Sequence, residues 1–217
     1  MSISTFIIGE SGTGKTASLR NLNPEETVLI QAIKKPLPFR SSGWKPFVAE
    51  DKPNSKGEMV KAYQWMQMAM ESAVKQGRKV IIIDDFQYLM STEFMKRSDE
   101  KGYGKFTELA RHAWEVVTKA TSLPDDVRVY ILSHIQTGDD GIARLKTIGK
   151  LLDEKITLEG MVTIVLRTAV MDGSYLFRVK NSGSDTVKTP IGMFDTETVE
   201  NDLKAVDDTI RDYYGIK

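Results

Sequence analysis

Gly9-Glu10-Ser11-Gly12-Thr13-Gly14-Lys15-Thr16 is the stretch of sequence that decides the fold. It has the spacing G-x-x-x-x-G-K-[ST] and directly follows the apolar run from Ile3 to Ile8, which predicts a strand. Glycines let the backbone turn tightly and aim successive N–H groups at one point, where the helix expected next presents its positive end. The stretch therefore predicts a loop that binds a polyphosphate, with a purely structural glycine-rich turn as the alternative.

The side chains at the end of this loop predict the ligand. Lys15 should reach the β- and γ-phosphates of a nucleotide, and the Thr16 hydroxyl should be a ligand of Mg²⁺ that arrives with it. ATP and Mg²⁺ are therefore the expected cofactors. The residues expected to contact the nucleotide are Gly9, Glu10, Ser11, Gly12, Thr13, Gly14, Lys15, Thr16 and Ala17.

Length and composition exclude several classes of protein. A chain of 217 residues predicts one domain over 1–217, with a core over about 1–170 and a C-terminal hairpin and helix over about 161–217. Its 30 basic and 30 acidic residues cancel, so no overall field attracts nucleic acid or anionic membrane. The absence of cysteine excludes disulfides and thiolate chemistry. With no signal peptide and no apolar run of membrane-spanning length, we expect a cytoplasmic protein without membrane partners.

The order of secondary structure predicts an α/β fold. Short β-rich runs alternate with helical stretches, a pattern typical of a mainly parallel twisted sheet flanked by helices. Met171-Asp172-Gly173-Ser174 predicts the turn of an antiparallel hairpin near the C-terminus. Met59 and the methionines that follow it at helical spacing predict a core-facing stripe. Strands are expected at 3–8, 27–31, 79–83, 127–132, 161–170 and 175–180, helices at 14–21, 57–76, 106–122 and 201–214, and a long loop at 34–56.

Two carboxylates follow the most apolar strand. Asp84 and Asp85 come directly after Val80 to Ile83, and in a parallel sheet ligands gather outside the carboxyl ends of the strands. Asp84 is therefore the expected partner of Mg²⁺, through a water or the Thr16 hydroxyl. Asp85 is the candidate that polarises the attacking water. Many strands end in a solvated acid, so this pair is informative only together with the phosphate loop.

Polar residues also follow the next predicted strand. Ser133 and His134 would lie beside the γ-phosphate, where a hydrogen bond made or lost reports whether the nucleotide is intact. His134 is the preferred candidate for this sensor. A histidine that caps its own strand end is the alternative.

These motifs together resemble a known family. The phosphate loop, Ile83 to Asp85, Leu132 to His134, and the stretches Lys35 to Arg40 and Thr186 to Phe194 are similar to those of phage-encoded, AAA-type RecA-like P-loop ATPases of the single-strand-annealing, recombination-associated group. The resemblance implies a RecA-like core, ATP hydrolysis coupled to assembly of a homo-oligomer, and single-stranded DNA as the partner, with a phage recombination or replication protein as a possible second partner in the host cytoplasm.

The resemblance also assigns positions beyond the phosphate loop. RecA-like proteins generally place a water-activating glutamate near the end of the second strand, where this chain has Gln31, so Asp85 would substitute or hydrolysis would be slow. Two loops, Lys96 to Lys105 and Gln136 to Lys146, correspond to the loops that touch DNA. Lys188 lies where a basic residue reaches the γ-phosphate of a neighbouring protomer.

Two other functions are consistent with the same loop. A small-molecule phosphotransferase of the nucleotide kinase type shares it, although the arginine-rich lid such enzymes need is not evident in the sequence. A nucleotide-gated binding module that does not hydrolyse ATP is the other alternative, and Gln31 favours it.

Overall fold

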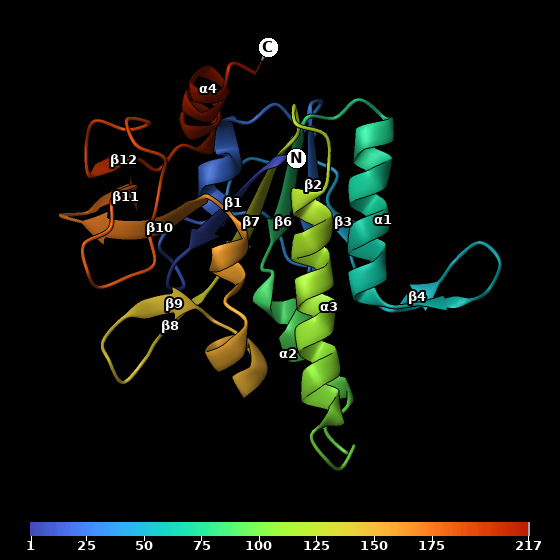
Figure 1. The fold of residues 1–217 in the computed structure, drawn as a ribbon. Helices are drawn as coiled ribbons and strands as arrows, with labels where there is room; N and C mark the ends of the chain where they lie inside the picture. Colours follow the sequence, from blue (N-terminus) through green and yellow to red (C-terminus); the bar gives the residue numbers. More distant parts are fainter. Residues whose placement is uncertain (217) are drawn as a thin grey trace.

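A twisted eight-stranded sheet forms the centre of the molecule (Figure 1). This computed structural model describes residues 1–216, so Lys217, the last residue of the predicted domain, lies outside the described residues. The strand order is β12-β11-β10-β1-β7-β6-β2-β3. The strands are β1 (Ile3–Ile8), β2 (Thr27–Gln31), β3 (Phe47–Val48), β6 (Val80–Asp84), β7 (Arg128–Ser133), β10 (Ile164–Met171), β11 (Ser174–Arg178) and β12 (Thr198–Glu200).

The sheet is parallel from β10 to β3 and antiparallel beyond β10. The turn at Asp172 and Gly173 joins β10 to β11 as the sequence predicts, and both residues have positive φ. Every residue of β6 and β7 is buried, and β6 begins with four consecutive Val and Ile residues, because helices cover both faces of the sheet. The predicted α/β class, a mainly parallel sheet with an antiparallel C-terminal extension, is confirmed.

Strand order determines which loops meet. Strand β7 lies between β1 and β6, and the three strands are parallel. Their carboxyl ends therefore bring three predicted segments to one edge of the sheet: the loop 9–16, the pair Ser133 and His134, and the pair Asp84 and Asp85.

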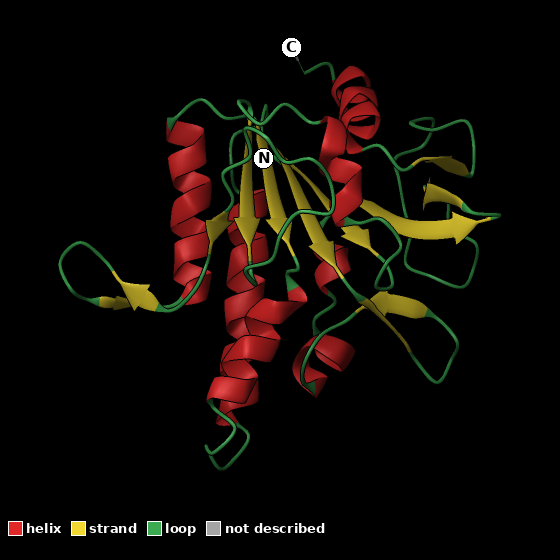
Figure 2. Cartoon of the chain, turned by 180° about the vertical axis from the view of Figure 1, so that it is seen from behind, coloured by secondary structure: helices red, strands yellow, loops and turns green. Residues whose placement is uncertain are grey.

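Helices pack on the two faces of the sheet (Figures 1 and 2). One face carries α1 (Ala62–Lys75) and α3 (Gly104–Thr121), with α2 (Gln87–Lys96) packed beside α3. The other face carries the 3₁₀ helix η1 (Thr16–Asn21) and α4 (Leu203–Tyr214).

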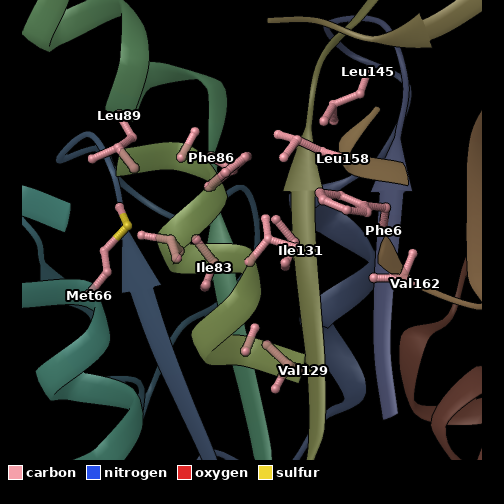
Figure 3. Packing of buried hydrophobic residues seen from close by; sticks show 14 of the residues in the cluster. Phe6, Met66, Ile83, Phe86, Leu89, Val129, Ile131, Leu145, Leu158 and Val162 are labelled. Carbon is pink, nitrogen blue, oxygen red and sulfur yellow. The ribbon is translucent and has the colours of Figure 1, made fainter. Parts of the chain in front are cut away.

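Alternation along β1 divides the core into two layers. Phe6 and Ile8 belong to the layer under α1 and α3, whereas Ile7 belongs to the layer under η1 and α4. Figure 3 shows the first layer, in which Phe6 lies among Ile131 of β7 and Leu158 and Val162, which precede β10. Phe86, the residue after Asp85, is fully buried there and lies 6.3 Å from the Phe6 ring, which anchors the chain just beyond the acidic pair.

Several predicted elements differ from the observed ones. The helix expected at 14–21 forms only as η1, and α2 was not predicted at all. The loop expected at 34–56 contains β3 and β4 (Lys52–Pro53), and β4 pairs with β5 (Met59–Val60). Met59 is therefore wrong as a core residue: it is 64% exposed because α1 begins only at Ala62.

The remaining elements lie between β7 and β10. They are β8 (Ile135–Thr137), β9 (Ala143–Leu145), the π-helix η2 (Leu151–Lys155) and the 3₁₀ helix η3 (Leu158–Met161). β8 and β9 form a hairpin that projects from the same side of the molecule as the turn between α2 and α3 (Figures 1 and 2). Within residues 1–216, no helix has the length and apolarity required to cross a membrane.

Candidate nucleotide site

The predicted phosphate loop connects β1 to η1 and depends on its glycines. Gly12 and Gly14 have φ values of 78° and 95°, a left-handed conformation that glycine adopts without steric cost. Gly9 has no room for a side chain, since a Cβ there would lie 1.9 Å from Thr168 Oγ1 of β10. The Thr13 hydroxyl lies 2.6 Å from the same Thr168 oxygen and donates to the Glu10 carbonyl. The loop is therefore fastened to β10.

Lys15 lies beneath this loop. Its Nζ donates to the carbonyls of Gly9 and Glu10, at 2.8 and 2.7 Å, and the residue is buried. Burial lowers the pKa of Lys15 to about 8, against the opposing influence of the Asp85 and Asp84 carboxylates. An ammonium group held against the backbone of a glycine-rich loop is suited to bind phosphate oxygens.

Asp84 ends β6 beside the loop, as the sequence predicts. The Thr16 hydroxyl donates to its carboxylate, with distances of 3.0 and 3.2 Å to the two oxygens. Burial, followed by the neighbouring Asp85 carboxylate, raises the pKa of Asp84 to about 6. A hydroxyl and a carboxylate in contact are the oxygen donors that Mg²⁺ prefers, so the residues present fit a magnesium ion carried by a nucleotide. Their role as metal ligands stays a prediction.

Asp85 faces the same cavity from an unusual backbone conformation. Its φ is 59°, which is uncommon for a residue with a side chain, and its side chain is 3% exposed. One carboxylate oxygen pairs with Lys35 Nζ, and the other lies 3.9 Å from His134 Nε2. Partial burial opposes the charge on Lys35, but its contact with Asp85 raises the pKa of Lys35 above its ordinary value.

The two sensor candidates differ in position. His134 lines the cavity, and burial together with the nearby Lys15 ammonium lowers its pKa. Ser133 is fully buried within the sheet, and its hydroxyl has no hydrogen-bond partner among the described residues. Geometry therefore favours His134, whose sensing role stays a prediction.

Lys15, Thr16, Asp85 and His134 line one cavity. Its volume is about 790 Å³, which is typical of small-molecule sites. Its far wall comes from the C-terminal hairpin and the residues after β12, which sequence analysis did not assign to the site. Tyr175 and Asn201 both lie against Gly14, since a Cβ there would lie 3.1 Å from Tyr175 Cδ1 and 2.9 Å from Asn201 Oδ1. Asn201 is 2% exposed, and its Nδ2 has no partner within residues 1–216. A buried amide without a partner fits a polar ligand.

Tyr175 and Asn201 are functional candidates that sequence reasoning missed, and Lys35 was not expected in the nucleotide site. Lys35 carried a weak signal, because it lies shortly after a strand that ends at the sheet's carboxyl edge. Tyr175 and Asn201 carried none, because only the pairing of β11 with β10 and of β12 with β11 brings them to the phosphate loop.

Lys188 does not line this cavity. Its backbone pairs with Val165 of β10, at 2.8 and 3.0 Å, and burial lowers the pKa of its ammonium. The role predicted for Lys188 requires a neighbouring protomer, so it stays a prediction.

The predicted DNA-contacting loops are largely engaged in internal contacts. Arg97 forms ion pairs with Glu93, Glu100 and Glu108, and Lys105 donates to three backbone carbonyls. Arg144 of β9 pairs with Asp140.

Comparison with known proteins agrees with the phosphate loop, the acidic strand end and the mainly parallel sheet. No curated protein matches the chain. A family model described as AAA domain matches residues 3–115, just over half of the chain, and this match includes the phosphate loop, Asp84 and Asp85. The chain therefore belongs to the AAA domain family of P-loop NTPases.

Proposed function

We propose that this protein binds ATP with Mg²⁺ and hydrolyses it to ADP and phosphate. The observation that carries the proposal is the contact between Thr16 and the Asp84 carboxylate, where Thr16 and Lys15 of the glycine loop line a cavity of nucleotide size. Membership of the AAA domain family supports nucleotide binding.

Each residue of the site has a distinct task in this proposal. Lys15 and the loop N–H groups hold the phosphates, and Thr16 and Asp84 hold the metal. Mg²⁺, when bound, would supply positive charge that offsets the negative charge of the phosphates. Asp85 orients a water, whose oxygen bonds to the γ-phosphorus while the bond to the ADP oxygen breaks and a water proton passes to the carboxylate.

Phosphate release from ATP, with Mg²⁺ or with EDTA, tests this proposal against its alternatives. We expect release that requires Mg²⁺ and no acceptor molecule. Tight ATP binding without release would instead indicate the nucleotide-gated binding module. Transfer to an added nucleoside or nucleotide would indicate the phosphotransferase.

We propose that the base of the nucleotide lies against Tyr175, which lines the cavity beside Gly14 and is 50% exposed. Replacing Tyr175 with alanine should weaken ATP and ADP equally, by about tenfold, because stacking on an aromatic ring contributes about 1–3 kcal/mol per base. Displacement of a bound fluorescent nucleotide by ATP, and separately by ADP, measures both affinities. Tyr175→Phe should bind normally, as should Tyr214→Ala on α4. Normal binding by Tyr175→Ala would place the base elsewhere.

We further propose that the hydrolysing form assembles as a homo-oligomer on single-stranded DNA, in phage recombination or replication. The resemblance in sequence supports this proposal, as does the common side from which the α2–α3 turn and the β8–β9 hairpin project (Figure 1). Lys101 and Tyr103 at the α2–α3 turn are exposed, Tyr103 by 88%. A cation beside an exposed ring is suited to a single strand, because it meets phosphate while the ring stacks a base.

Filter binding of a labelled oligonucleotide at low salt tests the assembly. We expect retention that requires ATP and falls about tenfold when Lys101 and Tyr103 are both replaced with alanine, from the loss of one stacking contact and one phosphate contact. The matched control is Lys75→Ala at the end of α1, which should leave retention unchanged. Retention that is absent, or equal with and without ATP, would reject the proposal.

A further inference from the structure

Lys35 places a second ammonium group in the nucleotide cavity. It lies in the segment after β2, and its Nζ pairs with the Asp85 carboxylate. The two partners differ in exposure: the Asp85 side chain is 3% exposed and the Lys35 side chain 41% exposed. Lys35 lines the same cavity as Lys15, Asp85 and His134.

The backbone that carries Lys35 is held firmly to the sheet. Gln31 is buried, and its Nε2 donates to the Lys35 carbonyl at 3.1 Å. Ala32 N donates to the Asp84 carbonyl at 3.1 Å, which fastens the start of the segment to the end of β6. The Lys35 Cα therefore has a defined place beside the acidic pair, while its long and partly exposed side chain is free to change partners.

We propose that Lys35 is a γ-phosphate-contacting residue supplied by the same chain, and that ATP binding exchanges its Asp85 partner for the γ-phosphate. This inference rests on the proposed ATP site. A triphosphate with its several charges competes well with one carboxylate for an ammonium group. Because ADP lacks the γ-phosphate, the Lys35 contact distinguishes the two nucleotides.

The exchange has two consequences for hydrolysis. Asp85 loses its cationic partner, so its carboxylate becomes available to orient water. Lys35 meets the oxygens of the transferred phosphoryl group, where a positive charge stabilises the transition state. Lys35 exchanges no bonds itself, and after phosphate leaves it pairs with Asp85 again. Gln31, at the position where RecA-like proteins carry a glutamate, then serves to position Lys35.

Nucleotide affinities of Lys35 variants test this inference. Lys35→Met should weaken a non-hydrolysable ATP analogue by about tenfold or more, the loss of one charge-assisted hydrogen bond, and change ADP affinity by less than about twofold. Turnover should fall by about a hundredfold. Lys35→Arg should restore preference for the ATP analogue over ADP. Lys34→Met provides the matched control, since Lys34 is exposed and does not line this cavity.

The outcomes separate this inference from the proposed function. An unchanged ratio of the two affinities in Lys35→Met would overturn it, as would faster turnover, which would mean that the pairing only restrains Asp85. Normal ADP binding by the variant shows that it is folded. If the natural protein discriminates ATP from ADP through Lys35 yet releases no phosphate, the inference about Lys35 is supported and the proposed hydrolysis is wrong. If the natural protein binds neither nucleotide, both are wrong.

Discussion

Lys15→Met should abolish nucleotide binding and hydrolysis while leaving the protein folded. The ammonium group is the only Nζ that donates to carbonyls of the phosphate loop among the described residues, and methionine has similar length and no charge. We expect affinity for ATP and ADP to fall by a factor of about a hundred or more, since a buried charged hydrogen bond to each of several oxygens is lost. Fluorescent nucleotide titration and phosphate release measure the two losses.

Lys15→Met should lose nucleotide binding without losing thermal stability. Burial lowers the pKa of Lys15 to about 8, which means that the folded protein disfavours the charged lysine at pH 7. Removing the charge should therefore leave the thermal midpoint unchanged or higher. Lys75→Met at an exposed site is the control. Binding within threefold of the natural protein would contradict the role given to Lys15, and a lower midpoint would contradict the cost of burying its charge. In the natural protein, ATP affinity should decline above about pH 8, because the free site then carries a neutral amine.

Asp84→Asn should stabilise the nucleotide-free protein and abolish magnesium-dependent activity. The pKa of Asp84 is raised from 3.8 to about 6, so the folded state disfavours the carboxylate by about 3 kcal/mol at most above pH 6. Asparagine keeps an oxygen that accepts from the Thr16 hydroxyl. We expect a gain of about 1–3 kcal/mol in the free energy of unfolding at pH 8, measured in urea.

The stability gained from Asp84→Asn should depend on pH in a defined direction. A carboxyl whose folded pKa is raised becomes destabilising as pH rises from its unfolded value of about 4 to its folded value of about 6. The gain from Asp84→Asn should therefore be absent near pH 4 and complete above pH 6 to 7. Asp125→Asn, at an exposed position, should show no gain. A loss of stability at pH 8, or phosphate release that still depends on Mg²⁺, would contradict the assignment.

Much of the sheet and of the phosphate-binding end of the site was predictable. The central strands are buried on both faces, so their sequences are continuous apolar runs, such as Val80 to Ile83, that have few other interpretations. The phosphate loop requires glycines at positions of positive φ, and that requirement is visible as a motif. Asp84 follows because parallel strands deliver their carboxyl ends to one edge.

The rest depends on contacts between distant segments. Helix α2 has a mixed polar sequence, and only packing of residues such as Leu89 and Phe94 against the core and α3 defines it. Strand β3 is a two-residue strand that exists through pairing with β2. Tyr175 and Lys35 reach the cavity from opposite ends of the chain, so no local pattern could join them.

The bond between Thr13 and Thr168 has a mechanical consequence. Thr168 lies in β10, which turns directly into β11, and β11 pairs with β12 at the edge of the sheet. The phosphate loop is therefore coupled to the antiparallel end of the sheet through one side-chain contact and two sets of strand pairing.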